Sequence, residues 1–227
     1  IEPNTGAMKI EFGSRETKFQ GMNYFMHIDP KHKDPGEVKK DTPPSTAAII
    51  VVGISEEFHA FVVDTWINEQ GKLDVLLLAA IDMYEKWGPR AVTFEAVGAQ
   101  VWFKDALLHH EKMTGKSYMR KKNKLLSRAN PWLPRMSKKL VESDKGTLNK
   151  EFQITGALEL QFNMGWLHLH EDQVALLEHI EAFPSRERPV DGADALAQGP
   201  GVWKPPMSIK GQKLIRQREA LVRAMHY

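Results

Sequence analysis

Four carboxylates stand at positions where they could perform chemistry together. Asp29 and Glu95 each end a short apolar run, and Asp191 and Asp194 open the last predicted helix, one turn apart. A strand-end acid with apolar neighbours needs a partner, because burying an unpaired carboxylate is costly. A divalent cation is one such partner, and two ions about 4 Å apart can activate water against a phosphodiester. The residues alone leave a second interpretation equally open: each acid caps a helix or pairs with a lysine, with Asp191 as an N-cap.

Other catalytic residue types are absent or poorly spaced. The chain has no cysteine, which excludes disulfides, thiolate zinc sites and a cysteine nucleophile. His168 and His170 share one face of a predicted strand, but a zinc site usually needs three or four protein ligands, so a polar strand face is favoured. His27 lies two residues before Asp29, hence on the same strand face, where it could support that acid. No complete phosphate-loop, metalloprotease, esterase, dinucleotide-binding or calcium-loop motif occurs.

The net charge of +2 conceals an uneven distribution. Between Lys112 and Lys150 there are twelve basic residues and two acids, so the rest of the chain is acidic. Such a block favours contact with a polyanion, whose phosphates would give salt-dependent binding with little sequence preference. A lysine-rich loop that is merely solvated is the alternative. The candidate DNA-binding residues are Lys116, Arg120, Lys121, Lys122, Lys124, Arg128 and Arg135.

Hydrophobic periodicity indicates the elements that position these residues. Three apolar, largely β-branched runs indicate successive strands, and later segments alternate between helical and extended patterns. The predicted elements are strands 24–29, 47–54 and 58–67, helix 72–87, strand 91–95, helix 100–113, an irregular basic segment 116–145, strand 166–170, and helices 171–183 and 191–197. This order predicts an α/β fold, a mixed sheet flanked by helices, in the order of the ribonuclease H fold.

The length of 227 residues suits one large domain or two small ones. No run of about 18 apolar residues occurs, so we expect no membrane-spanning segment. The chain begins with Ile1 and no secretory leader follows, so we expect a fragment or a processed chain. Residues 1–21 are expected to be an extension or linker, and residues 199–227, basic and amphipathic near their end, a C-terminal tail.

Several short motifs, taken in order, resemble the nuclease domain of the large terminase subunit of tailed bacteriophages. The similarity covers residues 22–198, and the order and spacing of the motifs carry it. The motifs are His27-Ile28-Asp29-Pro30, Val92-Thr93-Phe94-Glu95 followed by Gly98, Lys150-Glu151-Phe152-Gln153-Ile154, the segment 158–170 with Gly165-Trp166-Leu167-His168, and Phe183-Pro184 leading to the segment 191–197.

The resemblance implies a ribonuclease H-like endonuclease that uses two Mg²⁺ or Mn²⁺ ions to cut concatemeric double-stranded DNA during viral genome packaging. It implies that Asp29, Glu95 and Asp191 bind metal, with Asp194 one turn further on. We expect Lys150 to contact a phosphate and the basic segment 116–149 to hold the DNA. The implied partners are the portal, the small terminase subunit and a packaging ATPase domain that this sequence lacks, in the host cell cytoplasm and without a membrane.

One departure from the family pattern affects the third metal ligand. Family members often have His-Asp-Asp before the last helix, whereas Pro189 and Val190 occupy the first two of these places here. The choice between Asp191 and Asp194 is therefore open. Two other functions also remain open: a different ribonuclease H-fold nuclease, such as a junction resolvase or a hybrid nuclease, and a non-catalytic DNA-binding or capsid-docking module.

Overall fold

The structure of the chain is a computed structural model, and all structural statements below concern the residues that it describes. These are residues 9–12, 15–18, 21–30, 46–68, 72–94, 106, 109–110, 112–114, 147–184 and 190–206.

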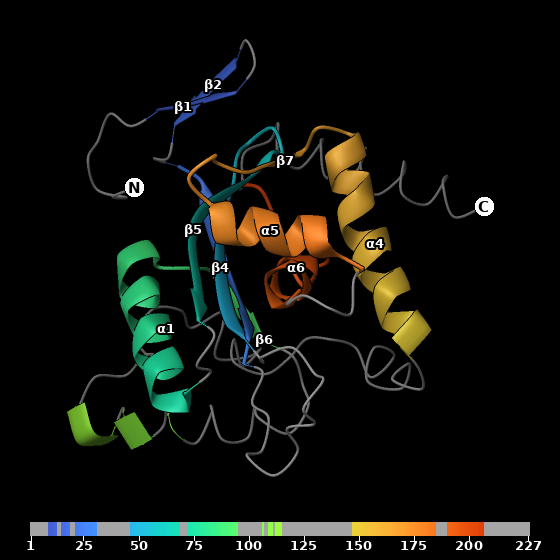
Figure 1. Cartoon of the computed structure of the whole chain (residues 1–227). Helices are drawn as coiled ribbons and strands as arrows, with labels where there is room; N and C mark the ends of the chain where they lie inside the picture. Colours follow the sequence, from blue (N-terminus) through green and yellow to red (C-terminus); the bar gives the residue numbers. More distant parts are fainter. Residues whose placement is uncertain are drawn as a thin grey trace.

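A five-stranded mixed sheet forms the centre of the molecule (Figure 1). Its strand order is β6-β3-β4-β5-β7, in which β3, β4 and β5 are antiparallel neighbours, while β6 pairs parallel with β3 and β7 parallel with β5. The predicted mixed sheet is thereby confirmed. The strands are β3 (Asn23–Asp29), β4 (Ala47–Ile54), β5 (Ala60–Asn68), β6 (Ala91–Phe94) and β7 (Leu167–His168).

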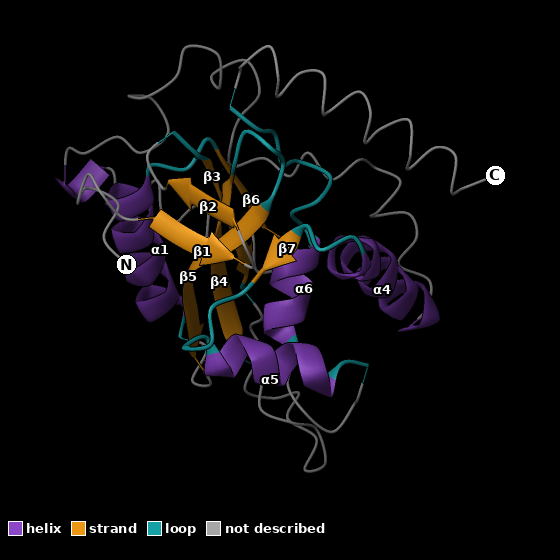
Figure 2. Cartoon of the chain, turned by 90° about the horizontal axis from the view of Figure 1, so that it is seen from above, coloured by secondary structure: helices purple, strands orange, loops and turns teal. Residues whose placement is uncertain are grey.

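Helices cover both faces of this sheet (Figure 2). Helix α1 (Leu73–Trp87) lies on one face, and α4 (Thr147–Asn163), α5 (Val174–Ala182) and α6 (Asp191–Ala197) lie on the other. All eight residues of β4 are buried, which explains why this strand is an uninterrupted apolar run rather than an alternating one.

Residues of each central strand alternate between two cores, one on each face of the sheet. Ile49 and Val51 pack in the core that includes α1, whereas Ala48, Ile50 and Val52 pack in the core that includes α4, α5 and α6. The same period of two assigns Met26 and Ile28 of β3 to the α1 side and Phe25 to the opposite side. His27 and Asp29 therefore belong to the face that α6 covers.

Helix α1 begins and ends close to its predicted bounds. Its buried face consists of Leu76, Leu77, Ala80, Ile81, Met83 and Trp87, spaced as an amphipathic helix requires. Gly88 ends the helix in the left-handed region (φ 55°, ψ 52°), and its N–H donates to the carbonyl of Tyr84 at 2.9 Å. Glycine adopts this conformation without steric cost, so the predicted stop at this position is confirmed.

Two elements were not expected from the sequence. Helix α4 occupies residues between the basic segment and the predicted strand at 166, and the buried residues among its described side chains are Ile154, Leu158 and Gln161. A two-stranded hairpin, β1 (Lys9–Phe12) paired with β2 (Arg15–Lys18), lies within the segment 1–21 that we expected to be an extension or linker.

Other predicted elements are shorter than expected or fall outside the described residues. Strand β7 has two residues rather than five, and α5 begins at Val174 rather than at 171. Of the predicted helix 100–113, only residues 106, 109–110 and 112–113 are described, and they are helical. The irregular basic segment 116–145 lies outside the described residues.

The core continues past Gln198, where the C-terminal tail was expected to begin. Trp203 is buried among the residues packed on the α6 side of the sheet. The side-chain amide of Asn23 donates to the carbonyl of Lys204 at 2.9 Å. Residues 199–206 are thus part of the fold. No helix among the described residues is long and apolar enough to cross a membrane.

Candidate metal centre

Asp29 is the last residue of β3, and the pleat of this strand turns it toward α6. Its Cα partner on β4 is Ala48, so the carboxylate sits at the end of a central strand rather than at a sheet edge. Its side chain is fully buried, with 0% exposure. Burying a carboxylate costs free energy, so a favourable interaction must offset this cost at Asp29.

Asp191 and Asp194 lie in the first turn of α6, three residues apart and thus on neighbouring positions of the same helix surface. The N-cap of this helix is Val190, whose carbonyl accepts from the N–H of Asp194 at 3.0 Å. The alternative in which Asp191 serves as the N-cap is therefore wrong. Asp191 is the first helical residue, and its carboxylate is directed to another part of the protein.

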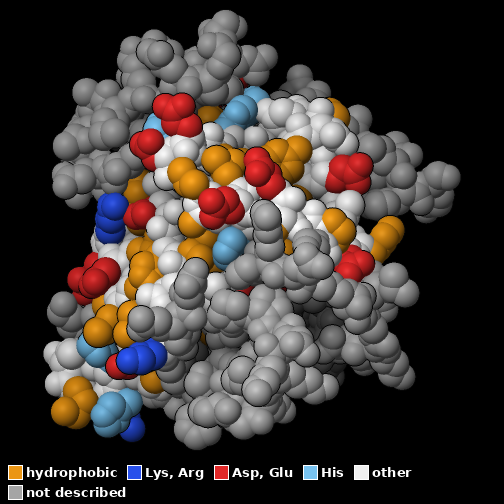
Figure 3. Space-filling model, viewed as in Figure 1, with side chains coloured by type: hydrophobic (Ala, Val, Ile, Leu, Met, Phe, Trp, Pro, Cys, Tyr) orange, Lys and Arg blue, Asp and Glu red, His pale blue; other side chains and the backbone are white. Residues whose placement is uncertain are grey.

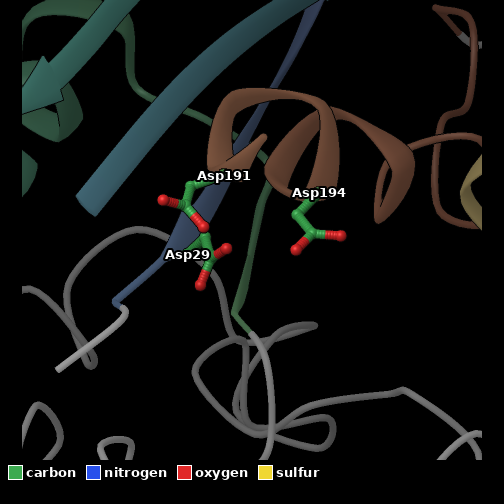
Figure 4. Close-up of side chains that lie close together, drawn as sticks. All are labelled: Asp29, Asp191 and Asp194. Carbon is green, nitrogen blue, oxygen red and sulfur yellow. The ribbon is translucent and has the colours of Figure 1, made fainter. Parts of the chain in front are cut away.

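The three aspartates converge on one point (Figure 4). One carboxylate oxygen from each of Asp29, Asp191 and Asp194 lies within 4.8 Å of the others. Asp191 and Asp194 are 3% and 6% exposed, so all three members are buried. We call these residues the aspartate cluster. Asp191 and Asp194 both belong to it, so both remain candidates for the third metal ligand.

Thr46, which directly precedes β4, holds one oxygen of Asp191. Its backbone N–H donates to Oδ2 of Asp191 at 3.1 Å, and its hydroxyl donates to the same oxygen. These two donors fix the rotation of the carboxylate. Thr46 falls between the predicted strands 24–29 and 47–54, and no sequence signal marked it as part of a site.

Close packing between α5 and α6 sets the position of Asp191 and Asp194. The N–H of Gly192 donates to Nδ1 of the buried His179 at 3.0 Å. A Cβ atom at position 192 would lie 2.9 Å from Cδ1 of Leu176 and 3.1 Å from Nδ1 of His179. A larger residue at this position would therefore force neighbouring side chains to shift, and Gly192 stands directly beside the first aspartate of the helix.

A second set of buried polar side chains lies behind the aspartate cluster. Nδ1 of His27 is 2.7 Å from Oγ1 of Thr93, and Nε2 of His27 accepts from Nε1 of Trp203 at 2.9 Å. Thr93 also donates to Oε1 of Gln198 at 3.1 Å. Burial lowers the pKa of His27 to about 3. His27 thus shares the strand face of Asp29, as its spacing predicted, and its ring nitrogens bond to Thr93 and Trp203.

His168 and His170 do not come together. Nε2 of His168 lies 2.8 Å from Nδ1 of His59, and its ring stacks on Phe61 at 4.7 Å. Burial, together with the neighbouring His59, lowers the pKa of His168 to about 4. His170 lies beyond β7, and its Nδ1 is 3.3 Å from an exposed carboxylate oxygen of Asp172. Within the described residues the aspartate cluster is the one group of three or more acids or histidines close enough to hold a metal ion.

The remaining predicted site residues are not fully described. Glu95 lies outside the described residues and follows Phe94, whose Cα partner on β3 is Ile28, the residue before Asp29. Lys150 is in α4, and its side chain is not described. The predicted DNA-binding residues also lie outside the described residues; they are Lys116, Arg120, Lys121, Lys122, Lys124, Arg128 and Arg135.

The donor set of the aspartate cluster fits a hard divalent cation. Carboxylate oxygens are the ligands that Mg²⁺, Mn²⁺ and Ca²⁺ prefer, and three negative charges this close repel one another in a buried setting. A cation between them offsets both the repulsion and the desolvation of the three groups. The aspartate cluster could therefore bind a metal ion.

Comparison with known proteins leaves the function to be argued from this geometry. A scan against protein-family models gives no match, and a search of curated proteins gives none.

Proposed function

We propose that the chain is a metal-dependent endonuclease that hydrolyses phosphodiester bonds of double-stranded DNA during viral genome packaging. The observation that carries this proposal is the convergence of Asp29, Asp191 and Asp194 at the end of the central strand β3. Asp29 and Asp191 are the acids for which the terminase resemblance, on sequence motifs alone, implies a role as metal ligands. The mixed sheet flanked by helices is compatible with the ribonuclease H-like fold which that family uses.

Four acidic residues of the chain would bind two Mg²⁺ or Mn²⁺ ions. We assign Asp29 to both ions, Glu95 to one, and Asp191 with Asp194 to the other. Bound ions would supply Lewis-acid chemistry, lowering the pKa of water and stabilising charge on the leaving oxygen. Thr46 keeps Asp191 oriented toward the other two acids. Lys150 would contact a phosphate of the substrate, where its charge offsets the charge that develops in the transition state.

The proposal assigns DNA binding to the basic segment 116–149, because the described surface is mainly acidic. Figure 3 shows Asp and Glu side chains spread over one face of the molecule, with few Lys or Arg. The exposed acids among the described residues are Glu56, Glu57, Asp74, Asp82, Glu85, Glu159, Glu171, Asp172, Glu178 and Glu181, against the exposed bases Lys72, Lys86, Arg90, Lys112 and Lys204. An acidic body repels a DNA duplex, so phosphate contacts require positive charge from elsewhere in the chain.

On this proposal the chain acts with the portal, the small terminase subunit and a packaging ATPase domain in the host cell cytoplasm.

Plasmid cleavage tests the proposed activity directly. Supercoiled plasmid is incubated with the parent protein in Mg²⁺, in Mn²⁺ and in chelator, alongside linear, branched and RNA–DNA hybrid duplexes. We expect cleavage of the plasmid and the linear duplex that needs the metal and is lost in Asp29→Asn. The matched control Asp82→Asn removes an exposed carboxylate on α1 and should cut like the parent. Cleavage that persists in chelator, or in Asp29→Asn, would contradict the proposal; preference for branched or hybrid duplexes would redirect it to those substrates.

Charge reversal tests the assignment of the DNA-binding segment. Replacing Lys121, Lys122 and Lys124 with glutamate should weaken binding to unrelated duplexes equally, because phosphates are the same in every sequence. It should also reduce the slope of log K against log salt by about 0.9 for each phosphate that the protein no longer neutralises. A salt titration with an unchanged slope would place the DNA elsewhere.

A further inference from the structure

The hydrogen bonds behind the aspartate cluster run in one direction. The indole Nε1 of Trp203 can only donate, so Nε2 of His27 accepts and the ring proton is on Nδ1. Nδ1 of His27 then donates to the hydroxyl oxygen of Thr93, and this hydroxyl donates to Oε1 of Gln198. The amide nitrogen of Gln198 in turn donates to the carbonyl of Ile28 at 3.3 Å. Each group is thus oriented by the one before it.

This chain of bonds joins the two elements that carry the aspartate cluster. His27 and Ile28 belong to β3 and directly precede Asp29. Gln198 is the C-cap of α6, the helix whose first turn contains Asp191 and Asp194. Thr93, on β6, is the Cα partner of His27 and stands between the two. We call the buried residues His27, Thr93 and Trp203, together with the partly buried Gln198, the buried polar network.

The buried polar network lies beside apolar residues of the core on the α6 side of the sheet. His27 has 0% exposure, and on the same face Phe25, Ile50 and Val52 are apolar, while Asp29 of the aspartate cluster lies two residues further along β3. Polar groups in such a place cost free energy unless every bond is made, and they fix a single arrangement when all are made. A network that only filled space would be replaceable by apolar side chains.

We propose that the buried polar network is a positioning device that sets the distance between Asp29 and the pair Asp191 and Asp194, and through it the affinity of the aspartate cluster for a divalent cation. This inference rests on the proposed function, because it assumes that the cluster binds metal. None of the four residues touches the metal or the substrate. They act through the two elements that they connect.

Variants of Thr93 test the network at its midpoint. Thr93→Val removes the hydroxyl and breaks two bonds at nearly constant volume, whereas Thr93→Ser keeps the hydroxyl. Mn²⁺ affinity of the full chain is measured by calorimetry without DNA. We expect Thr93→Val to weaken Mn²⁺ binding about 10-fold or more, the usual cost of removing a group that orients metal ligands, and Thr93→Ser to bind like the parent. Equal affinities in the parent and Thr93→Val would overturn the inference.

A stability control separates positioning from general loosening of the fold. Val63 packs in the opposite core, beside α1, so Val63→Ala destabilises the protein without touching the network. Gln198 is only partly buried, and Gln198→Met removes its two bonds with little change in length. We expect Gln198→Met to weaken Mn²⁺ binding and Val63→Ala to leave it unchanged. Equal losses in both would show a structural role only and overturn the inference. A parent that binds no Mn²⁺ would instead contradict the proposed function itself.

Discussion

Replacing Asp194 with asparagine should uncouple the stability of the protein from divalent cations. The ligand oxygens of the aspartate cluster lie within 4.8 Å of one another. At an effective dielectric constant of about 20, two unit charges at that distance repel by about 3.5 kcal/mol. Asp194→Asn removes one charge and relieves two of the three repulsions while keeping the side-chain volume. The variant should therefore melt at a temperature no lower than the parent in chelator.

Thermal melts with and without Mn²⁺ provide the measurement. A cation that binds only the folded state stabilises it by about 2.7 kcal/mol at 100 times its Kd. For a chain of this size, this free energy raises the melting temperature by about 5 to 10 °C. The parent should show this rise, and Asp194→Asn should show little of it, because one of the three described ligands is removed.

Asp82, an exposed aspartate of α1, provides the control for this experiment. Asp82→Asn removes the same charge at a distance from the cluster and should keep the full rise with Mn²⁺. The reasoning fails if Mn²⁺ leaves the melting temperature of the parent unchanged, or if Asp194→Asn keeps the whole rise.

Three further predictions concern the surroundings of the cluster. Thr46→Val should reduce metal-dependent cleavage about 10-fold, because it removes the hydroxyl that orients Asp191, and Thr46→Ser should restore it; equal rates would refute the role. Gly192→Ala should destabilise the protein by about 1 to 3 kcal/mol in denaturant unfolding, because its Cβ would collide with a leucine of α5, whereas Gly156→Ala, with open space around it, should be neutral or stabilising; the opposite order would refute the packing. His168 has a folded-state pKa of about 4 against an ordinary value of 6.5, so the folded state favours the neutral ring. Its contribution is complete above pH 6.5 and is lost as pH falls toward 4, by about 1 kcal/mol after allowance for its partial exposure. Melts across this range should fall less steeply for His168→Gln than for the parent, and parallel curves would contradict the assignment.

The central sheet and α1 could be predicted from the sequence because their burial patterns are local. β4 is a continuous apolar run, and α1 presents Leu76, Leu77, Ala80 and Ile81 at helical spacing before a glycine. Helix α4 could not be predicted in the same way, because the buried residues among its described side chains, Ile154, Leu158 and Gln161, form no continuous apolar stripe.

The aspartate cluster was only partly predictable. The resemblance implied that Asp29 and Asp191 bind metal. The spacing of three residues predicted that Asp194 lies beside Asp191 on the same helix. Thr46 lies 145 residues from Asp191 in the sequence, and Trp203 lies 176 residues from His27. No local pattern links residues so far apart. Their contacts follow from the packing of α6 and the segment after it on the sheet, which periodicity does not reveal.

The aspartate cluster combines residues that are far apart in the sequence and are therefore synthesised at different times. Asp29 lies on the first strand of the central sheet, whereas Asp191, Asp194 and Trp203 lie in its last described segments. A nascent chain can pair β3, β4 and β5 early, whereas contacts of such long sequence separation form more slowly. His27 gains its indole partner only after residue 203 has left the ribosome. The complete aspartate cluster therefore cannot form before Asp194 has left the ribosome, however early the central strands have paired.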